Sequence, residues 1–428
     1  MKKLNIAIVG LGNIGSYLYQ YLKKNKKILS KKNNCIPNII YISAKNKKKK
    51  RGFKINNKIW LKNYLDATKK KNVDLIVELI GGAEGPAKKL VFSALKNKKH
   101  VVTANKALIA KYGDQLSKIA EKNRVNLEFE ASVCGGVPII RSLKEGLIAN
   151  KIKKIYGIFN GTSNYILSCM DKKNKNFKDV LYDAKQLGYA ESNPAADLNG
   201  DDVSAKLKIL SSLCFNSFLN DNINVEGIKE IDKEDINNAN TLGYKIKLLG
   251  FAEKINNNIY QRVHPTLIKK SSYVASIDGV LNAVIVDGSP VGQSIIQGEG
   301  AGPAATTSAL ISDISSILRG NVKFPFSISN KERKKLNFKD ILDRSFSAYL
   351  RFEVKDQPGV LSNITQLFSK NSVSIKRLIQ NPNKNKGSSS IIVITHLSKN
   401  KSLYKIIKAV NKRSYVLKRS KLIRIDDI

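Results

Sequence analysis

The residues best suited to chemistry lie between Gly188 and Ser212, where an acidic, turn-rich segment leads into a helical pattern. Asp202 and Lys206 stand four residues apart, so the predicted helix carries both side chains on one face near its first turn. An aspartate beside a lysine can hold the ammonium in place as a proton donor. It can equally be a surface ion pair worth about 0.3–0.5 kcal/mol. Taken alone, the pair favours the surface interpretation, and the rest of the chain decides against it.

The composition limits the class of protein. The 428 residues suffice for two or three domains, and 42% of them are hydrophobic. The formal net charge is +41, but lysines are spread through nearly every predicted loop and aromatic residues do not interleave with them, so no nucleic-acid partner is expected. No apolar run reaches membrane-spanning length, so no membrane partner is expected either.

Four cysteines, Cys35, Cys134, Cys169 and Cys214, show no metal-type spacing. They predict reduced thiols in a cytoplasmic protein. No histidine stands close in sequence to activate Cys134, so we expect it to be a packing residue and not a nucleophile.

The N-terminal residues predict a dinucleotide site. Leu4–Val9 is an apolar strand, Gly10-Leu-Gly-Asn-Ile-Gly15 follows at once, and Ser16–Lys23 continues as a helix. In this context the glycines permit a tight turn, close approach to a pyrophosphate and helix–strand packing, with phosphates at the helix N-terminus. The predicted cofactor-binding residues of this turn are Gly10, Gly12, Asn13, Ile14 and Gly15.

The end of the second predicted strand, Ile39–Ser43, bears on the type of cofactor. An acidic residue there would bind the ribose hydroxyls of NAD. The chain instead has Lys45 and a basic run ending at Arg51, which suits the 2′-phosphate of NADP. We therefore expect NADP(H) to be preferred and NAD(H) to be usable, although the run could also be one more lysine-rich loop.

Further candidates follow later strands. The strand His100–Thr103 leads to Lys106, and ligands of open α/β sheets lie beyond the carboxyl ends of strands, so Thr103 and Lys106 are placed near the nicotinamide end of the cofactor. The turn Gly135–Pro138 could form a nest for a ligand or a hard cation. The turn Asn160–Asn164 could cap a helix or bind substrate.

These residues carry a resemblance. The segments GLGNIG, TANKAL, EASVCGGVPII, GIFNGTSNYIL, GYAESNPAADLNGDDVSAKLKIL and QGEGAGPAAT, spread over roughly residues 1–325, resemble the homoserine dehydrogenases and occur in that family's order. The resemblance implies NAD(P)H-dependent reduction of L-aspartate 4-semialdehyde to L-homoserine, a step toward threonine, methionine and isoleucine.

The resemblance also implies residue roles. Lys206 would be the proton donor, Lys106 a second catalytic lysine, and Glu191 and Asp202 would hold the amino and hydroxyl ends of the substrate. A proton donor is needed because hydride addition builds charge on the aldehyde oxygen. Burial and the second ammonium would lower the pKa of the donor lysine.

The same resemblance gives the remaining site residues. Gly188 and Gly302 match cofactor-contacting glycines. A structural sodium ion would be held by Glu130, Val133, Gly135 and Val137. The chain departs from the family pattern at Cys134, where glycine is expected, and at Asn193, where an acidic residue is expected; the first departure bears on the sodium site.

The C-terminal part predicts a separate module. Its order of elements, βαββαβ, is ferredoxin-like, and the turn Asp356–Leu361 (DQPGVL) resembles that of ACT domains, which often bind amino acids. Threonine is the expected effector. The alternative is a dimerising module that has lost its ligand.

Together these features predict an α/β chain. The expected parts are a Rossmann-type nucleotide domain (1–130), an α+β catalytic and dimerisation domain (131–322, with 300–320 packing back on the first), a linker (323–347) and an ACT regulatory domain (348–428). A homodimer or homotetramer is expected. The alternatives are a related NAD(P)-dependent amino-acid semialdehyde dehydrogenase and a nucleotide-sensing regulatory protein.

Overall fold

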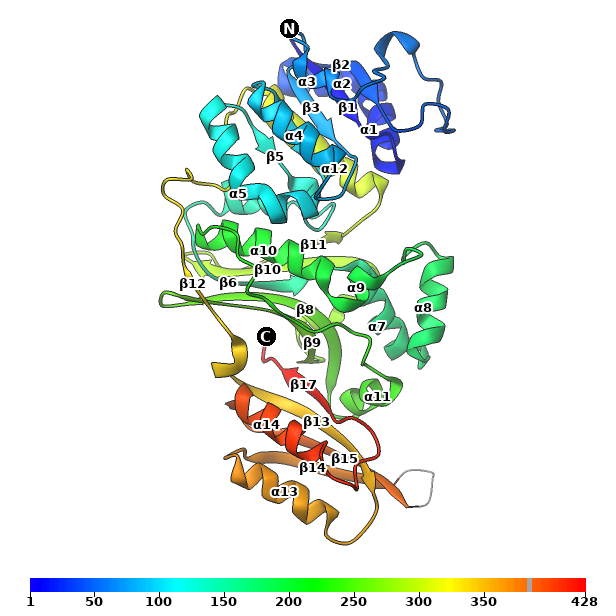
Figure 1. The fold of residues 1–428 in the computed structure, drawn as a ribbon, viewed down its shortest axis with the longest axis vertical. Coiled ribbons are helices and arrows are strands. Elements are labelled where there is room, and N and C mark those ends of the chain that lie inside the picture. The colour runs from blue at the N-terminus through cyan, green and yellow to red at the C-terminus, as the bar shows by residue number, and fades with distance from the viewer. Residues whose placement is uncertain (383–386) are drawn as a thin grey trace.

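Three tiers of structure follow one another along the longest axis of the molecule (Figure 1). The computed structural model describes residues 1–382 and 387–428. The N-terminal tier and the C-terminal tier lie at opposite ends, and the middle tier separates them (Figure 1). Within the described ranges, no helix is long and apolar enough to cross a membrane.

The first tier is a five-stranded parallel sheet in the order β2-β1-β3-β4-β5. Its strands are β1 Lys2–Val9, β2 Cys35–Ser43, β3 Leu75–Glu78, β4 His100–Thr103 and β5 Leu127–Glu128. Its helices are α1 Asn13–Lys24, α2 Lys26–Asn33, η1 Asn57–Ile59, α3 Asp66–Lys69, α4 Pro86–Lys96 and α5 Lys106–Asn123. The strands are almost continuously apolar because helices cover both faces of the sheet.

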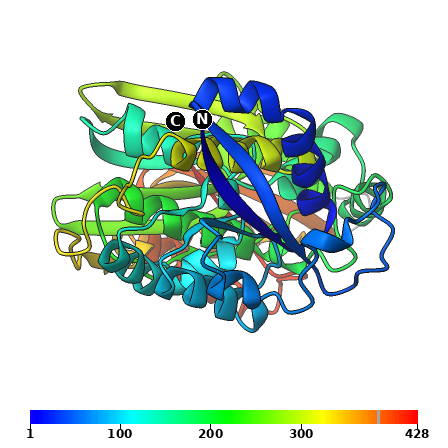
Figure 2. The same cartoon turned by 90° about the horizontal axis from the view of Figure 1, so that it is seen from above.

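A helix from much later in the chain completes this tier. In the view from above, the olive α12 (Pro303–Leu318) crosses behind the blue β1 and β2 (Figure 2). Its apolar residues, among them Leu310 and Ile314, share one core cluster with Leu18 of α1. The expected return of the chain to the nucleotide tier is therefore found.

The middle tier is built on the antiparallel order β11-β10-β6-β8-β9. The strands of this tier are β6 Lys151–Ile158, β7 Asn224–Val225, β8 Tyr244–Ile255, β9 Asn258–Lys269, β10 Leu281–Ser289, β11 Gly292–Glu299 and β12 Asn337–Lys339. Its helices are η2 Glu130–Ser132, α6 Ile139–Arg141, η3 Ser142–Gly146, α7 Gly161–Lys173, α8 Phe177–Gln186, α9 Ala195–Asn199, α10 Asp201–Phe215, α11 Lys233–Thr241 and η4 Tyr273–Ser276.

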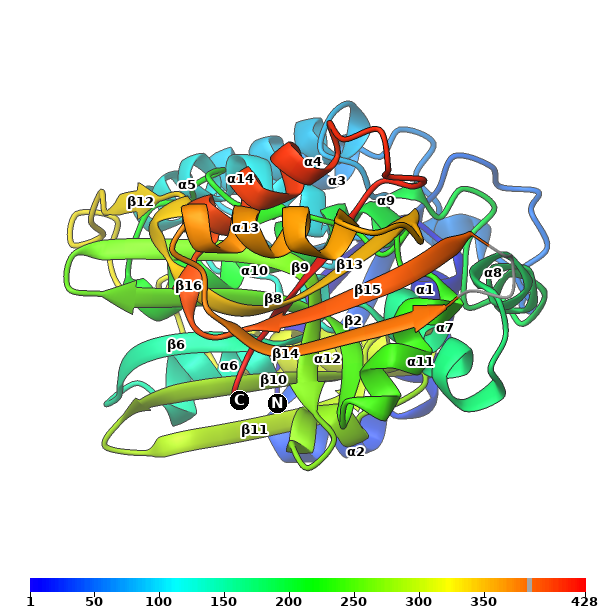
Figure 3. The ribbon, with the colours of Figure 1, turned by 90° about the horizontal axis from the view of Figure 1, so that it is seen from below.

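The third tier has the predicted βαββαβ order. Its elements are η5 Ile341–Asp343, β13 Ser345–Lys355, α13 Val360–Lys370, β14 Ile375–Pro382, β15 Ser388–Thr395, β16 Ser398–Lys399, α14 Asn400–Val410 and β17 Lys421–Ile425. Seen from below, α13 and α14 lie together on one face of the strands (Figure 3). Val360, Ile364 and Phe368 recur four residues apart, so α13 buries one stripe against the sheet.

The third sheet does not end at its own edge. β17 pairs in parallel with β9, with Arg424 opposite Thr266, so the middle and third sheets form one twelve-stranded sheet. The Arg424 side chain is fully buried and binds both carboxylate oxygens of Glu226 at 3.0 and 2.9 Å. The sequence pattern did not reveal this junction, because each module could close its own sheet.

The segment predicted as a linker, 323–347, is packed against both neighbouring tiers. β12 pairs in parallel with β9. The buried Arg333 donates to Asp114 of α5 at 2.6 Å and to the carbonyl oxygen of Ser217 at 2.8 Å. Its lysine-rich composition and Pro325 indicated a linker, but its partners lie far away in sequence.

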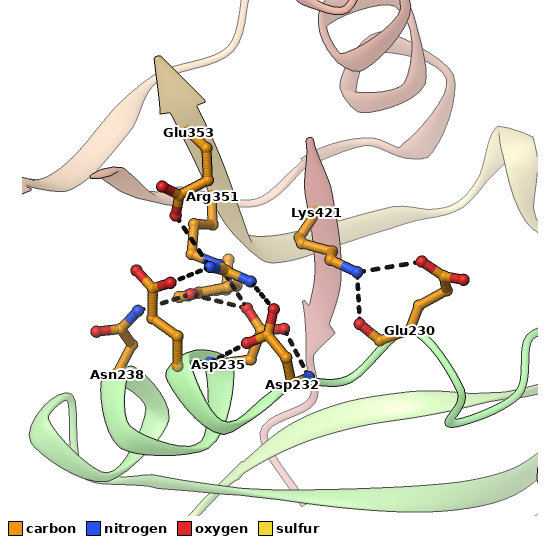
Figure 4. Close-up of polar contacts among 9 residues, drawn as sticks. Glu230, Asp232, Asp235, Asn238, Arg351, Glu353 and Lys421 are labelled. Atoms are coloured by element: carbon orange, nitrogen blue, oxygen red, sulfur yellow. Dashed lines mark hydrogen bonds and ion pairs between the residues drawn. The ribbon is translucent and has the colours of Figure 1, made fainter. Parts of the chain in front are cut away.

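A cluster of carboxylates around Arg351 joins the middle and third tiers (Figure 4). Arg351 of β13 contacts Asp235 at 2.8 Å and Glu353 at 3.0 Å, and it also binds Asp232 and Glu234. Burial raises the pKa of Asp235 to about 6 even though Arg351 opposes the rise. One guanidinium thus serves four carboxylates, three of them contributed by α11 and its N-cap.

We expect Arg351→Met to lower the free energy of unfolding by about 3–5 kcal/mol, because it leaves buried carboxylates without their cation. The control is Lys421→Met, which breaks the neighbouring pair with Glu230, a carboxylate whose side chain is 78% exposed. Loss of this pair should cost less than about 1 kcal/mol. Equilibrium urea unfolding of the full chain measures the free energy of unfolding of each variant. Equal losses in the two variants would show that Arg351 contributes no more than a surface ion pair.

Candidate active site

A cavity of about 710 Å³ lies between the first and middle tiers. Both tiers contribute to its wall. The first tier contributes Lys106 at the start of α5, beyond the carboxyl end of the parallel sheet, and the middle tier contributes Asp202 near the start of α10. The lining includes Ile14, Lys106, Cys134, Gly135, Asn160, Gly188, Glu191, Asp197, Asp202, Lys206, Gly300 and Gly302. The cavity therefore brings together the four predicted catalytic and substrate residues, Lys106, Lys206, Glu191 and Asp202, and part of the predicted cofactor set.

Asp202 lies between two lysines. Its Oδ2 is 2.7 Å from Lys206 Nζ and its Oδ1 is 3.0 Å from Lys106 Nζ. The side chains of Asp202 and Lys206 are 7% and 10% exposed, whereas that of Lys106 is 43% exposed. The pair is therefore not a surface ion pair.

The electrostatics of this triplet differ from the sequence expectation. Burial alone would raise the pKa of Asp202, but Lys206 and Lys106 hold it well below its usual range. Burial alone would lower the pKa of Lys206, but the attraction of Asp202 raises it above its ordinary value. The predicted lowering of the Lys206 pKa is wrong, because a carboxylate stands between the two ammonium groups.

Asn160 binds the two carboxylates, Asp197 and Asp202, that lie near Lys206. Its Nδ2 donates to Asp202 at 2.9 Å and to Asp197 at 2.7 Å, and its Oδ1 accepts the Ser163 N–H at the start of α7. It is both the helix cap and a wall of the cavity. Asp197, on α9, was missed by the sequence reasoning; its place in the same acidic segment was the only signal. Burial, with Asp202 adding to it, raises its pKa.

The loop before α9 forms an exposed edge of the cavity. Gly188 and Glu191 both line it, and both are exposed. Thr162 Oγ1 donates to the Tyr189 carbonyl oxygen at 2.7 Å, which attaches the loop to the start of α7. Asn193, the second departure from the family pattern, is exposed and its side chain accepts the Ala195 N–H.

The glycine-rich turn has the geometry that its motif requires. A Cβ on Gly10 would lie 2.3 Å from the Leu79 carbonyl oxygen, and one on Gly15 would lie 1.9 Å from the Gly10 carbonyl oxygen. Both positions therefore exclude a side chain. Nothing lies within 4 Å of a Cβ on Gly12, so the space before the N-terminus of α1 is open.

A second hollow, of about 370 Å³, adjoins this turn. It is lined by Gly12 and Asn13 and, from the basic loop, by Lys49, Lys50 and Arg51. Arg51 Nε donates to the Leu11 carbonyl oxygen at 3.0 Å, which ties the basic loop to the glycine turn. Lys45 is exposed and lines neither cavity.

Thr103 is buried and does not line the cavity. Its Oγ1 donates to Glu78 at 2.5 Å and accepts the Asn105 N–H at 3.0 Å. Glu78, which the sequence reasoning missed, also accepts the Ile80 and Gly81 N–H groups. Thr103 thus supports the loops that lead to Lys106 from within the fold.

The candidate sodium residues form one buried turn. Both carboxylate oxygens of Glu130 accept N–H groups, from Ile140 at 2.9 Å and from Arg141 at 2.6 Å, and burial raises its pKa to about 7. Val133 and Val137 are fully buried. Gly135 has φ +52°, and a Cβ there would lie 2.5 Å from the Gly300 carbonyl oxygen.

Cys134 has φ +55°, a left-handed conformation that glycine adopts more easily. Burial raises the pKa of its thiol to about 11, so the thiol remains protonated at neutral pH. A protonated thiol is a poor nucleophile. The interpretation of Cys134 as a packing residue fits this environment.

A separate cavity of about 480 Å³ lies in the third tier, at the start of α13. It is lined by Val354 to Leu361, Gln380 and Ile391. The predicted DQPGVL turn therefore forms one wall of a hollow.

Family models match three parts of the chain. Residues 10–130 match the NAD binding domain of homoserine dehydrogenase, residues 138–315 match homoserine dehydrogenase, and residues 348–414 match the ACT domain. The three ranges fall mainly on the first, middle and third tiers in turn, and the second also includes most of α12, which packs on the first tier.

Relatives match the full length. A homoserine dehydrogenase of Neisseria gonorrhoeae is 39% identical, with 100% of each chain covered. The crystal structure of a homoserine dehydrogenase from Thiobacillus denitrificans is 36% identical, with a TM-score of 0.93 and coverage of 100% of this chain and 99% of that one. A hyperthermophilic archaeal homoserine dehydrogenase mutant in complex with NADPH is 25% identical, with a TM-score of 0.63 and coverage of 73% and 97%. The chain therefore belongs to the homoserine dehydrogenase family.

Proposed function

We propose that the protein reduces L-aspartate 4-semialdehyde to L-homoserine with NADPH, on the biosynthetic route to threonine, methionine and isoleucine. The observation that carries the proposal is the Lys106–Asp202–Lys206 triplet in the wall of a cavity that also includes Ile14 of the glycine-rich turn. Membership of the family gives the substrate, and the archaeal relative that binds NADPH supports the cofactor.

The chain's own residues fit a dinucleotide. The open space at Gly12 and the N-terminus of α1 suit a pyrophosphate. When bound, the nicotinamide supplies the hydride, so the protein has only to provide a proton and a place for charge on oxygen. Gly188 and Gly302 are exposed in the cavity wall and are proposed cofactor contacts.

Lys206 is the proposed proton donor. Its ammonium has three N–H groups: one faces Asp202 at 2.7 Å and another donates to the Phe159 carbonyl oxygen at 2.6 Å. The third is then available to the substrate oxygen. Because Asp202 raises its pKa, Lys206 carries this proton throughout the neutral range. Lys106, which is more exposed, stabilises the charge that develops on oxygen.

The carboxylates hold the other end of the substrate. We assign Glu191 and Asp202 to the amino and hydroxyl groups, and add Asp197, whose carboxylate lines the same cavity. Two lysines already neutralise Asp202, which leaves Glu191 and Asp197 as the proposed partners of a substrate ammonium.

The basic loop supports a preference for NADPH. Lys49 and Lys50 line the hollow beside Gly12, where a 2′-phosphate would have cations within reach, and Arg51 braces the loop. Lys45 was the sequence candidate for this role and is the alternative.

We also propose a structural sodium ion near Glu130. The described part of the chain has no group of three or more His, Cys, Asp or Glu side chains that could hold a metal, so the ligands would be Glu130 and the backbone oxygens of Val133, Gly135 and Val137. These donors are all oxygen, which suits a hard cation. Each carboxylate oxygen of Glu130 retains a lone pair beside its N–H bond.

Regulation and assembly complete the proposal. The cavity at the DQPGVL turn would take threonine, with the effector's carboxylate at the N-terminus of α13. β11 leaves an unpaired edge on the described sheet, which supports pairing of subunits. The four unpaired cysteines suit a reducing cytoplasm.

The enzyme assay is NADPH oxidation with aspartate 4-semialdehyde, with and without threonine and in sodium or potassium buffer. We expect Lys206→Ala to fold and to lose about 10²–10⁴-fold in kcat, the usual contribution of a general acid. The matched control is Lys208→Ala on the same helix, whose partner Asp221 is 91% exposed; it should keep wild-type kcat. Turnover only with another semialdehyde would favour the related dehydrogenase, and no turnover would favour a regulator.

Asp202→Asn should introduce an alkaline limb into the pH profile of kcat. In the wild type the pKa of Lys206 is raised, so activity should persist to about pH 10. Without the carboxylate, burial lowers the pKa of Lys206 against only weaker attractions such as that of Asp197, so protonated enzyme is lost as pH rises through the new, lower value. A profile that stays flat to pH 10 in the variant would refute this role of Asp202.

The double variant Lys49→Ala/Lys50→Ala should raise KM for NADPH about tenfold or more, because a lost charge-assisted hydrogen bond costs about 1.5–3 kcal/mol. KM for NADH should not change. The comparison is Lys45→Ala; if only this variant discriminates between the two cofactors, the phosphate site lies at Lys45 instead.

A further inference from the structure

Asn282 is a fully buried amide near the start of β10, behind the wall of the active-site cavity. Its Nδ2 donates a hydrogen bond to the Phe159 carbonyl oxygen at 3.0 Å. The same carbonyl oxygen accepts Lys206 Nζ at 2.6 Å. One backbone oxygen is therefore held both by the proposed proton donor and by Asn282.

The same amide supports the turn that leads into α12. A Cβ placed on Gly300 would lie 2.2, 2.3 and 2.3 Å from side-chain atoms of Asn282, so the backbone of Gly300 rests directly on the amide. Gly300, Ala301 and Gly302 line the cavity, and Gly302 is a proposed cofactor contact. Asn282 thus binds the carbonyl oxygen that accepts from the proposed proton donor and also packs against Gly300 in the turn of the proposed cofactor contact.

The position of the Phe159 oxygen matters for proton transfer. An ammonium turns freely about its Cε–Nζ bond, so the direction of its third N–H depends on where its two acceptors lie. For Lys206 those acceptors are Asp202 and the Phe159 carbonyl. Asp202 is itself fixed by Asn160 and Lys106. The carbonyl follows the end of β6, and Asn282 is the side chain that binds it from β10.

We propose that Asn282 is a positioning residue for the reduction: it fixes the Phe159 carbonyl, and through it the Lys206 ammonium, at a set distance from the Gly300–Gly302 turn. The inference rests on the proposed function. Asn282 stays outside the cavity lining and touches neither substrate nor cofactor. Its role is therefore geometric, and it should affect the chemical step more than binding.

The test compares two substitutions at Asn282 with one elsewhere. Asn282→Leu keeps a branched side chain of four heavy atoms under Gly300 but cannot donate to the carbonyl; Asn282→Ala removes the amide altogether. The control is Asn126→Leu. Asn126 is equally buried, donates to the Asn321 carbonyl oxygen and accepts the Lys323 N–H at 2.9 Å, within the nucleotide tier.

We expect both Asn282 variants to lose about 10–100-fold in kcat, as misplaced catalytic groups do, with a smaller change in KM for NADPH. The primary isotope effect on kcat, measured with NADPH deuterated at the transferred position, should increase because the chemical step becomes slower. Asn126→Leu should lower the melting temperature and leave kcat and the isotope effect unchanged. Asn282→Ala keeps the test valid if Asn282→Leu does not fold.

Two failures can be told apart. Wild-type protein that does not oxidise NADPH with aspartate 4-semialdehyde would overturn the proposed function and the inference with it. Active wild-type protein, with Asn282 variants whose kcat and isotope effect match those of Asn126→Leu, would overturn the inference alone.

Discussion

The site depends on one buried carboxylate that is shared by cations from two tiers. Lys106 comes from the nucleotide tier and Lys206 from the middle tier, and both meet Asp202. A buried aspartate with a single partner would still carry part of its desolvation cost, but two ammonium groups and the Asn160 amide satisfy it. Catalytic geometry and the docking of the two tiers are therefore one and the same interaction. A substitution that separates the tiers would also separate the lysines.

The remaining contacts between tiers explain how this geometry is kept. The chain returns to the nucleotide tier through α12, and the segment 323–347 attaches to α5 through Arg333. On the other side, β17 extends the middle sheet into the third tier, and Arg351 binds α11. Apolar packing holds α12, whereas the other junctions each include a buried guanidinium, from Arg333, Arg424 or Arg351. Arginine suits these places because it stays charged and offers several donors in a fixed plane.

Sequence patterns were most informative where chemistry and backbone geometry are local. The contacts of Gly10 and Gly15 follow from a motif between a strand and a helix, and the Asp202–Lys206 pair follows from helical spacing. Topology alone placed Lys106 near them. The position of Asp202 between two ammonium groups required tertiary structure, and so the direction of the Lys206 pKa was predicted wrongly.

Non-local pairing explains what the sequence did not reveal. A lone Asn282 in an apolar strand has no periodic signal. Its meaning comes from Phe159, which lies 123 residues away in sequence, and from Gly300, which follows the neighbouring strand β11. The pairing of β17 with β9 joins Arg424 and Thr266, which belong to different modules of the sequence. The segment 323–347 has the composition of a linker, and only its partners show that it is packed.

The basic and acidic side chains of the protein are distributed differently between its surface and its interior. The chain has 75 lysines and arginines and only 34 aspartates and glutamates. Several of those acids are buried and tied to chosen donors, as Asp202, Glu130 and Asp235 are. The excess of cations is therefore left mainly to the solvent-exposed lysines, where it attracts anions over about a Debye length and weakens with salt. Surface lysines thus favour the encounter with an anionic dinucleotide, while these buried carboxylates are already paired with donors of the chain itself.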